Sequence, residues 1–291
     1  AQQQALDASG QRQLDDYIRH LQSDKTSPDL LLPEQRNRLE ALLAAQRKKT
    51  APAISILEGN EFVFSNLSYL GCTLPSVQLL PLLDNNASKT HDQWRAYAAE
   101  NNSSIPNSVL WYQMLRHLYR VRNESHAAAD SLTAALRSEF DQYWLHTGTK
   151  ISYGSGLDAR IDHLELDGSS RKVALDIPAF TRHDDNWSYL VLAPQQPVSS
   201  LGNASPIPRN AEPILDAFFG AGYAEAGTVF QYAASRKDNG QTLREVRLWV
   251  PTTRNTERCL VLGVYYGSDG FYVDAGVLSY VVRARGVVAS S

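Results

Sequence analysis

The stretch LGVYYGSDGFYVDAGVLSYVVRARGV, residues 262–287, decides the fold class of this chain. Its apolar residues alternate with other residues, as expected for β-strands that bury one face. The intervening positions carry Tyr, Ser, Asp and Gly, which supply rigid contact area and adaptable hydrogen bonds in binding loops. The stretch therefore predicts a sheet with a fixed frame and with outward side chains suited to recognition.

The composition of this stretch also indicates how its outward residues could be exchanged. Residues 265–282 contain no Lys, Glu, Gln, Met or Trp, although the rest of the chain contains all five types. An AAC or AAT codon cannot produce these five types when only its adenines are randomised. Diversification that changes only adenines would therefore produce a segment without these five residue types. The simpler alternative is a pair of edge strands whose tyrosines lean over the sheet.

Outside this stretch the chain changes character near residue 147. We expect a helical hairpin arm over 1–50, then over 51–146 a mainly helical region with one short β-hairpin, and after it a strand-rich region over 147–291. The Gly-Asn pair within residues 54–64 predicts the hairpin. Helices are expected over 11–22, 90–102, 107–122, 125–145, 210–220 and 228–234, and strands over 150–153, 163–168, 172–180, 245–251, 258–264, 270–275 and 281–288.

The overall composition argues against several classes of protein. A chain of 291 residues, 43% of them hydrophobic, can bury a large core. Its net charge of -3 gives no basis for binding nucleic acid or an anionic membrane surface. No apolar run reaches the length of a membrane span, and the first residues lack the layout of a secretory signal. Cys72 and Cys259 fit no disulfide or zinc pattern, and we expect both to be buried thiols.

Sequence motifs for catalysis are absent or incomplete. The segment YGSGL around Ser155 is not a G-x-S-x-G elbow, because Tyr153 stands where the first glycine should be. His183, Asp184 and Asp185 form the best metal-like cluster, but neighbouring residues rarely bind one ion and a polar loop explains them. We therefore predict a chain that is not an enzyme, with no catalytic residue, no metal site and no cofactor.

A longer segment carries a family resemblance. Residues 247–288, RLWVPTTRNTERCLVLGVYYGSDGFYVDAGVLSYVVRARGVV, resemble the variable proteins of diversity-generating retroelements. Residues 144–153 and the two short helices expected over 210–234 are similar to segments of the same group. The resemblance implies an α+β fold: a helical N-terminal region followed over 147–291 by a C-type lectin-like domain with a twisted, mostly antiparallel sheet, related to the formylglycine-generating enzymes. It implies a ligand-binding protein whose surface patch is rewritten by reverse transcription.

The resemblance also divides the C-terminal residues into two sets. The frame is expected to comprise Leu260, Leu262, Val264, Ala284, Arg285 and Gly286. The expected ligand-binding positions are Tyr265, Tyr266, Ser268, Asp269, Phe271, Tyr272, Asp274, Ser279 and Tyr280. We expect the partner to be a protein or a glycan, with no nucleic acid and no membrane span, and with a homo-oligomer as an open alternative.

Two alternatives to the binding hypothesis stay open at this point. An enzyme of the formylglycine-generating or hydrolytic kind would need His146, His163 and His183 in one pocket with a carboxylate, whereas Cys259 lacks the nearby cysteine partner that the former enzymes use. His146, beside Trp144, is expected to have a structural role instead. A structural subunit would use residues 265–280 to pack against a neighbouring copy.

Overall fold

A computed structural model of the chain defines its fold. The structure describes residues 53–57, 61–124, 126–153, 158–176, 189–193, 204–206, 212–234, 244–249, 256–265 and 270–290. Residues Pro52–Ser291 form one compact unit. The predicted arm over 1–50 lies outside the described residues, as do Ser155 and the cluster of His183, Asp184 and Asp185.

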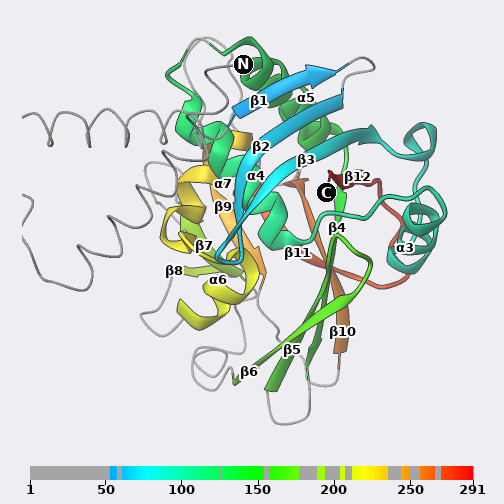
Figure 1. Cartoon of the computed structure of the whole chain (residues 1–291). Coiled ribbons are helices and arrows are strands. Elements are labelled where there is room, and N and C mark those ends of the chain that lie inside the picture. The colour runs from blue at the N-terminus through cyan, green and yellow to red at the C-terminus, as the bar shows by residue number, and fades with distance from the viewer. Residues whose placement is uncertain are drawn as a thin grey trace, which may run out of the picture. The chain divides into compact units, whose positions relative to one another are not determined.

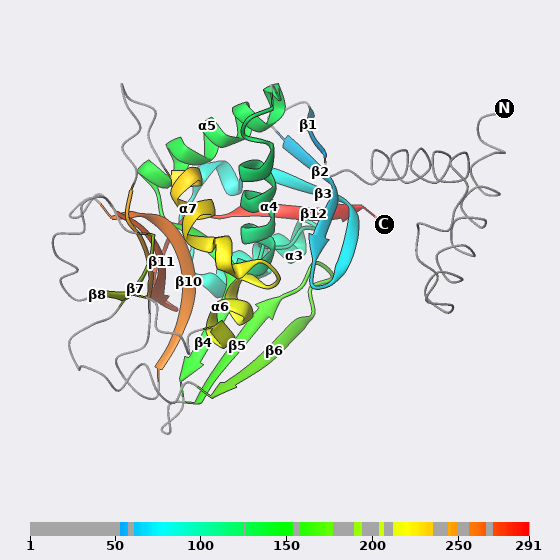
Figure 2. The ribbon, with the colours of Figure 1, turned by 90° about the vertical axis from the view of Figure 1, so that its left-hand side faces the viewer.

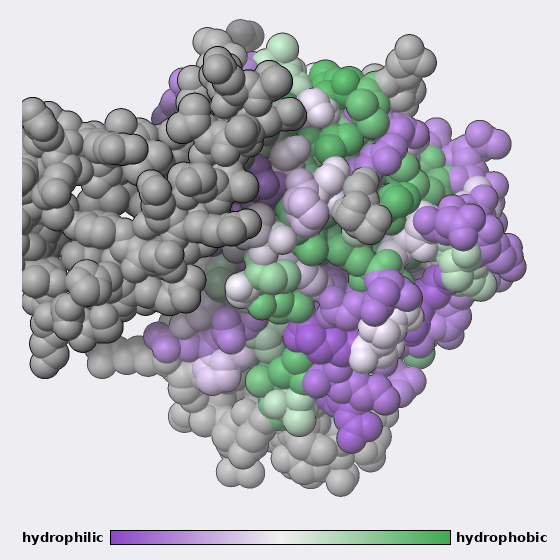
Figure 3. All heavy atoms as spheres, in the orientation of Figure 1, coloured by the Kyte–Doolittle hydropathy of each residue, from purple (hydrophilic) through white to green (hydrophobic). Residues whose placement is uncertain are grey.

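A four-stranded antiparallel sheet forms one side of this unit, in the order β1-β2-β3-β12 (Figure 1). Its strands are β1 (Ala53–Leu57), β2 (Glu61–Tyr69), β3 (Cys72–Leu82) and β12 (Arg285–Ser290). The predicted hairpin is confirmed, because β1 and β2 pair antiparallel with Leu57 opposite Glu61. The side chains of Ile56 and Leu57 in β1 are exposed, and Figure 3 shows hydrophobic residues over this sheet.

Three helices follow the small sheet, as the helical spacing predicts: α3 (His91–Glu100), α4 (Ser108–Val121) and α5 (Ala127–Gln142). A 3-10 turn, η2 (Asp84–Asn86), precedes them. The side chain of Asn107 caps α4 by accepting a hydrogen bond from the backbone N–H of Leu110. Most residues of α4 are buried, and Figure 2 shows why, since this helix runs between the small sheet and strands β10 and β11.

The larger sheet has eight strands in the order β6-β5-β4-β10-β11-β9-β7-β8. Its pairs are antiparallel except β11–β9 and β7–β8, so the expected α+β class with a twisted, mostly antiparallel sheet is confirmed. The strands are β4 (Leu145–Tyr153), β5 (Asp158–Leu164), β6 (Ser170–Asp176), β7 (Tyr189–Ala193), β8 (Ala204–Pro206), β9 (Val246–Trp249), β10 (Thr256–Tyr265) and β11 (Gly270–Val277).

One strand expectation is wrong in its extent. Residues 163–168 were expected to form a strand, but β5 ends at Leu164 and a turn follows, closed by a hydrogen bond from the N–H of Gly168 to the carbonyl of Glu165. Gly168 has a φ of +81°, which a residue with a side chain rarely adopts. The Asp-Gly pair is a turn signal, and it outweighs the apolar residues before it.

Helices α6 (Glu212–Phe219) and α7 (Ala226–Ala234) lie where short helices were predicted, joined by η5 (Tyr223–Glu225). One continuous apolar cluster includes residues of both sheets and of helices α4 to α7. The helices before residue 147 therefore share a core with the strands after it. Among the described residues, none of the helices has both the length and the apolar character that crossing a membrane requires.

Candidate ligand-binding surface

The hairpin of β10 and β11 forms the centre of the large sheet and has two distinct faces. Its antiparallel register runs from Arg258 opposite Val277 to Tyr265 opposite Gly270. Leu260, Leu262 and Val264 share one face, the inner face, and are at most 4% exposed. The expected frame is confirmed as buried, since Ala284, Arg285 and Gly286 are buried as well.

Phe271 belongs to the inner face and not to the ligand-facing positions, so the expectation for this residue is wrong. Its ring stacks on Phe230 of α7, with centroids 5.6 Å apart, and meets Phe140 of α5 edge to face at 5.1 Å. It pairs with Val264 across the hairpin, and its side chain is fully buried. Because consecutive residues of a strand face opposite sides, Phe271 and Tyr272 cannot both point outward.

The opposite side of the hairpin, the outer face, presents Tyr265 and Tyr272. Tyr265 is 56% exposed. Tyr272 is only 5% exposed, because its ring lies among Tyr265 at 5.8 Å, Trp144 at 6.4 Å and the guanidinium of Arg247 at 5.7 Å. Tyr272 thus lies on the outer face, as expected, but it is buried and packs against Tyr265 instead of being accessible to a ligand.

The far end of the outer face carries Tyr280. The chain turns after β11, with the N–H of Tyr280 bonded to the carbonyl of Val277, and the Tyr280 ring then lies over Gly276. A Cβ atom at Gly276 would lie 3.2 Å from Cδ1 of that ring. Tyr280 is 43% exposed and Ser279 is exposed too, while Asp274 is half-buried and accepts a hydrogen bond from the N–H of Ala275.

Exposed apolar side chains concentrate around these residues. Of the seven large hydrophobic residues that are exposed in the described part of the chain, four lie between residues 265 and 281: Tyr265, Val277, Tyr280 and Val281. Tyr265 lies at one end of the hairpin, and Val277, Tyr280 and Val281 lie at the other end, seven residue pairs away in the register. Exposed large hydrophobic residues that gather in one region commonly mark an interaction site. Tyr266, Ser268 and Asp269 lie outside the described residues.

Glycine and backbone hydrogen bonds hold the base of this surface in place. The Trp144 indole approaches Gly263 so closely that a Cβ there would lie 3.0 Å from two of its ring atoms. Residues 281–284 are anchored on two sides, by reciprocal backbone bonds between Lys89 and Val282 and by a bond from the N–H of His146 to the carbonyl of Arg283. The Nε1–H of Trp94 also donates to the Val282 carbonyl at 2.6 Å. The outer face therefore rests on a rigid frame.

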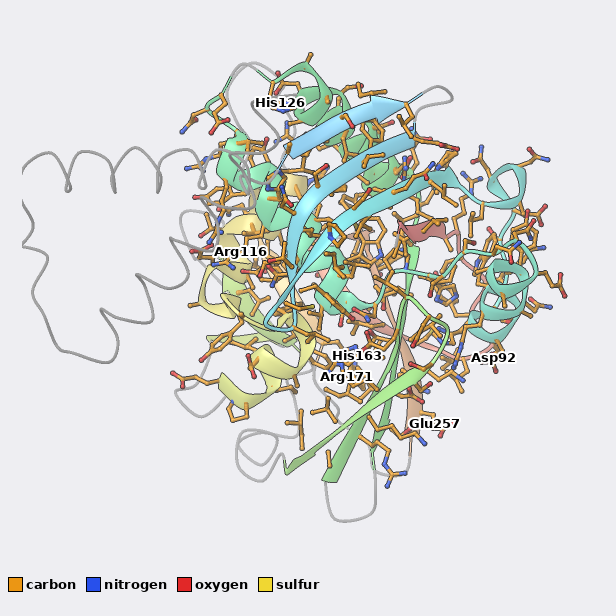
Figure 4. All side chains as sticks on the ribbon, in the orientation of Figure 1. Asp92, Arg116, His126, His163, Arg171 and Glu257 are labelled. Carbon is orange, nitrogen blue, oxygen red and sulfur yellow. The ribbon has the colours of Figure 1, made fainter. Side chains whose placement is uncertain are left out.

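The histidines of the enzymatic alternative have separate surroundings. His163 lies between Thr149 Oγ1 and the carbonyl of Ala217, each 3.0 Å from a ring nitrogen, and burial lowers its pKa to about 3. In Figure 4, His163 lies near Arg171, apart from Asp92 on α3. His146 instead contacts His91, the neighbour of Asp92 in sequence, with ring centroids 5.6 Å apart. His183 lies outside the described residues.

The structure brings together a cluster that the sequence analysis missed. His91, His146 and Cys259 each offer one ligand-type atom, and these three atoms all lie within 4.8 Å of one another. Burial lowers the pKa of His91 to about 3 and that of His146 to about 4, and it raises the pKa of the Cys259 thiol to about 11. Both rings are therefore neutral at pH 7 and the thiol is protonated. The three residues lie far apart in sequence, so no spacing motif could reveal them.

The two cysteines differ in environment. Cys259 is fully buried, as expected, but Cys72 is exposed, so the expectation that it is a buried thiol is wrong. Cys72 begins β3 directly after the turn at Leu70 and Gly71, and its thiol donates to the carbonyl of Tyr69 at 2.8 Å. A strand end beside a tight turn lies at the surface, which overrides the usual preference of cysteine for the interior.

A surface hollow lies near the small sheet. Its lining includes Phe62, Ser131, Glu139 and Arg285. Glu139 and Arg285 form an ion pair with each other, with Arg285 Nε 2.8 Å from Glu139 Oε2, so each charge already has a partner within the protein.

Comparison of the chain with protein-family models, with curated proteins and with solved structures finds no match.

Proposed function

We propose that this chain is a non-catalytic binding protein that holds a protein ligand on the outer face of the β10–β11 hairpin. We propose further that a retroelement diversifies the residues of that face. The observation that carries the proposal is the division of the hairpin into a buried inner face and an outer face that ends in the exposed Tyr265, with the exposed Tyr280 following β11. The finer fold assignment, a C-type lectin-like domain over 147–291, belongs to the same proposal and is supported by the sequence resemblance.

The two faces make different contributions to stability. Fully burying a side chain such as Leu262 or Phe271 contributes about 1.5–3 kcal/mol, and these residues pack against the helices. Substitutions at exposed positions such as Tyr265 usually change stability by about 0.5 kcal/mol or less. The exposed positions Tyr265, Ser279 and Tyr280 can therefore be replaced in many combinations while the core stays intact, whereas Cys259, Val261 and Tyr272 on the same side are buried. This tolerance is what a diversified binding surface requires.

The chemistry of the outer face favours a protein as ligand over a glycan. Tyr265 and Tyr280 provide large contacts with few rotatable bonds. Val281, 52% exposed, adds aliphatic surface that has little to offer a sugar hydroxyl. A specific protein complex buries about 800 Å² on each partner. Tyr265 pairs with the first residue of the eight-residue strand β11 and Tyr280 follows its last residue, so a partner that contacts both spans the length of this strand.

A display experiment tests the capacity of the outer face to bind. One library randomises the exposed positions Tyr265, Ser279 and Tyr280. A control library randomises Arg160, Lys172 and Ala174, which are exposed on β5 and β6 of the same sheet. Both are selected against one unrelated globular protein. We expect the outer-face library to yield binders at least ten times more often, and equal or lower yields would contradict the proposed function.

Size-exclusion chromatography separates the binding hypothesis from the assembly alternative. The variant in which Tyr265 and Tyr280 are both changed to Ala should elute at the position of the unchanged chain, because these residues serve a ligand and not a neighbouring copy. A shift of the double variant to a smaller particle would favour the structural subunit. Circular dichroism of both samples verifies that the variant is folded.

The diversification itself is tested in DNA. The proposal requires a near-copy of the segment that encodes residues 265–282 beside the gene, together with a reverse transcriptase. The two copies should differ at positions where the near-copy has adenine. A genomic neighbourhood without such a repeat would remove the retroelement from the proposal, while the display experiment would still decide on binding.

A further inference from the structure

Three ligand-type side chains converge beneath the outer face from three separate elements. His91 begins α3, His146 lies in β4 and Cys259 lies in β10. They are 2%, 0% and 0% exposed, and their ligand atoms lie within 4.8 Å of one another. No other described group of His, Cys, Asp and Glu side chains has this arrangement.

The polar atoms of this cluster lack the partners that buried groups normally have. Both ring nitrogens of His146 and Nε2 of His91 are buried without a hydrogen bond. Backbone groups of Lys89 and Tyr280 lie near the His146 ring and slightly oppose the fall in its pKa, but neither has hydrogen-bond geometry. An unpaired buried polar group costs about 1–3 kcal/mol. Such a cost at three atoms calls for a ligand that satisfies them.

The thiol of Cys259 is also held loosely. Its sulfur lies 3.4 Å from the carbonyl oxygen of Gly276 and 3.7 Å from that of Val277. A thiol is a weak hydrogen-bond donor, so exchanging these two contacts for a metal–sulfur bond costs little. The sulfur is therefore available as a ligand, with the two imidazoles beside it.

We propose that His91, His146 and Cys259 bind one thiophilic transition-metal ion, with Cu⁺ preferred over Zn²⁺. Thiolate sulfur and imidazole nitrogen are the ligands that both ions favour. Binding forms one metal–sulfur and two metal–nitrogen bonds and releases the thiol proton to solvent. The inference goes beyond the proposed function and stands without it.

The three ligand atoms can bind a single ion once the side chains bring them slightly closer together. Three ligands at about 120° around one ion, with metal–sulfur and metal–nitrogen bonds of about 2.3 and 2.0 Å, place the sulfur about 3.7 Å from each nitrogen and the two nitrogens about 3.5 Å apart. The ligand atoms of the cluster, which lie within 4.8 Å of one another, reach these distances through rotations of the side chains. Residues on a helix and two strands of one packed core keep the arrangement in place.

Charge selects between the two ions. Lys150, Arg95 and Arg258 act on the cluster with positive potential, and the carboxylate of Asp92 is paired with the Lys150 ammonium at 2.7 Å. A thiolate with Cu⁺ is neutral overall, whereas a thiolate with Zn²⁺ leaves a buried positive charge near these cations. Burying an unpaired charge is strongly unfavourable. Zn²⁺ also prefers four ligands, and the described cluster supplies three.

Metal binding to the full chain tests the proposal. The purified protein is unfolded and refolded under ascorbate with Cu⁺ or with Zn²⁺, and bound metal is measured after gel filtration. We expect one Cu⁺ per chain, at least tenfold tighter binding than Zn²⁺ in competition with a chromogenic chelator, and a higher melting temperature with Cu⁺. X-ray absorption at the copper edge should show one sulfur and two nitrogen ligands.

Matched variants locate the site. Cys259→Ser and His146→Gln should lose the bound Cu⁺, while Cys72→Ser and His163→Gln, which change an exposed cysteine and another buried histidine, should keep it. If a cluster variant does not fold, the absorption spectrum of the unchanged protein decides. Substoichiometric copper, a spectrum without sulfur, tighter Zn²⁺ binding, or equal binding by Cys259→Ser would each overturn the proposal.

Discussion

Two consecutive residues, Phe271 and Tyr272, decide how the candidate site is built. Both are aromatic, yet Phe271 packs on Phe230 in the core and Tyr272 lies on the outer face beneath Tyr265. The alternation of a strand places such neighbours on opposite sides, so the sequence is sufficient to exclude one of them from the ligand-facing set. The choice between them follows from the phase of Leu260, Leu262 and Val264. By contrast, the burial of Tyr272 depends on Trp144, directly before β4, and on Arg247 in β9, and no local sequence pattern reveals these contacts.

The contrast between the two faces predicts unequal costs of truncation. Phe271→Ala should lower the free energy of unfolding by about 3–5 kcal/mol, because it empties a packed site between two helices. Tyr265→Ala should change it by about 0.5 kcal/mol or less. Urea unfolding followed by tryptophan fluorescence measures both. Similar losses for the two variants would mean that the outer face is part of the core.

His163 makes the fold sensitive to acid. Its pKa is lowered from 6.5 to about 3 in the folded state, chiefly by burial, so below pH 6.5 the unfolded chain binds a proton that the folded chain does not. The free energy of unfolding therefore falls as the pH decreases from 6.5 towards 3, by up to about 1.4 kcal/mol per pH unit for this group. Urea unfolding at pH 7, 6 and 5 should show a shallower decline for His163→Gln. A steeper or unchanged decline would mean that other groups dominate.

At the scale of elements, local signals and long-range pairings differ in how far sequence predicts them. The helices α3, α4 and α5 follow from helical spacing, and the β1–β2 hairpin follows from its Gly-Asn pair. The pairing of β12 with β3 has no such signal, because the register between distant strands is set by the whole core. The same holds for the meeting of His91, His146 and Cys259, which depends on how α3 packs against the large sheet.

Arg285 joins β12 to two other elements. Its guanidinium donates to both carboxylate oxygens of Glu139 on α5 and, at 2.8 Å, to the carbonyl of Leu80 in β3. Arg285→Ala should lower the free energy of unfolding by about 3–5 kcal/mol, because it removes a buried guanidinium with its hydrogen bonds and leaves the half-buried Glu139 carboxylate without its partner. The double variant Arg285→Met with Glu139→Leu should cost less than Arg285→Ala alone. Thermal and urea unfolding measure the free energy of unfolding of these variants. If the loss in the double variant equals the sum of the losses in the two corresponding single variants, Arg285 and Glu139 are not coupled.

At the scale of the whole molecule, two sheets enclose the helices α4, α5 and α7 (Figure 2). The fold class can be predicted from the sequence, because the spacing of apolar residues changes from helical to alternating near residue 147. The core shared by the residues before and after that position cannot be predicted in this way, because the spacing does not tell which apolar faces pack together. Residues before and after that position contribute to one cluster. The small sheet contains the first and the last of the described strands.

Removal of the last strand should therefore affect the first ones. A chain shortened by residues 285–291 should lose hydrogen-exchange protection in β2 and β3, because β3 then has an unpaired edge and Glu139 has no cation. The β10–β11 hairpin should keep most of its protection, since its partners β4 and β9 stay in place. Deletion of Ser291 alone serves as control. Unchanged protection in β3 would contradict this dependence.

The pairing of β3 with β12 also has a consequence for folding during translation. Arg285 is translated about 200 residues after the end of β3, which corresponds to about 10–40 s of synthesis on the ribosome. Throughout that interval the nascent β3 edge has bare amide and carbonyl groups, a template on which another emerging chain can add a strand. Chaperones that shield extended segments, or slow initiation that spaces ribosomes along the message, would raise the yield of native protein.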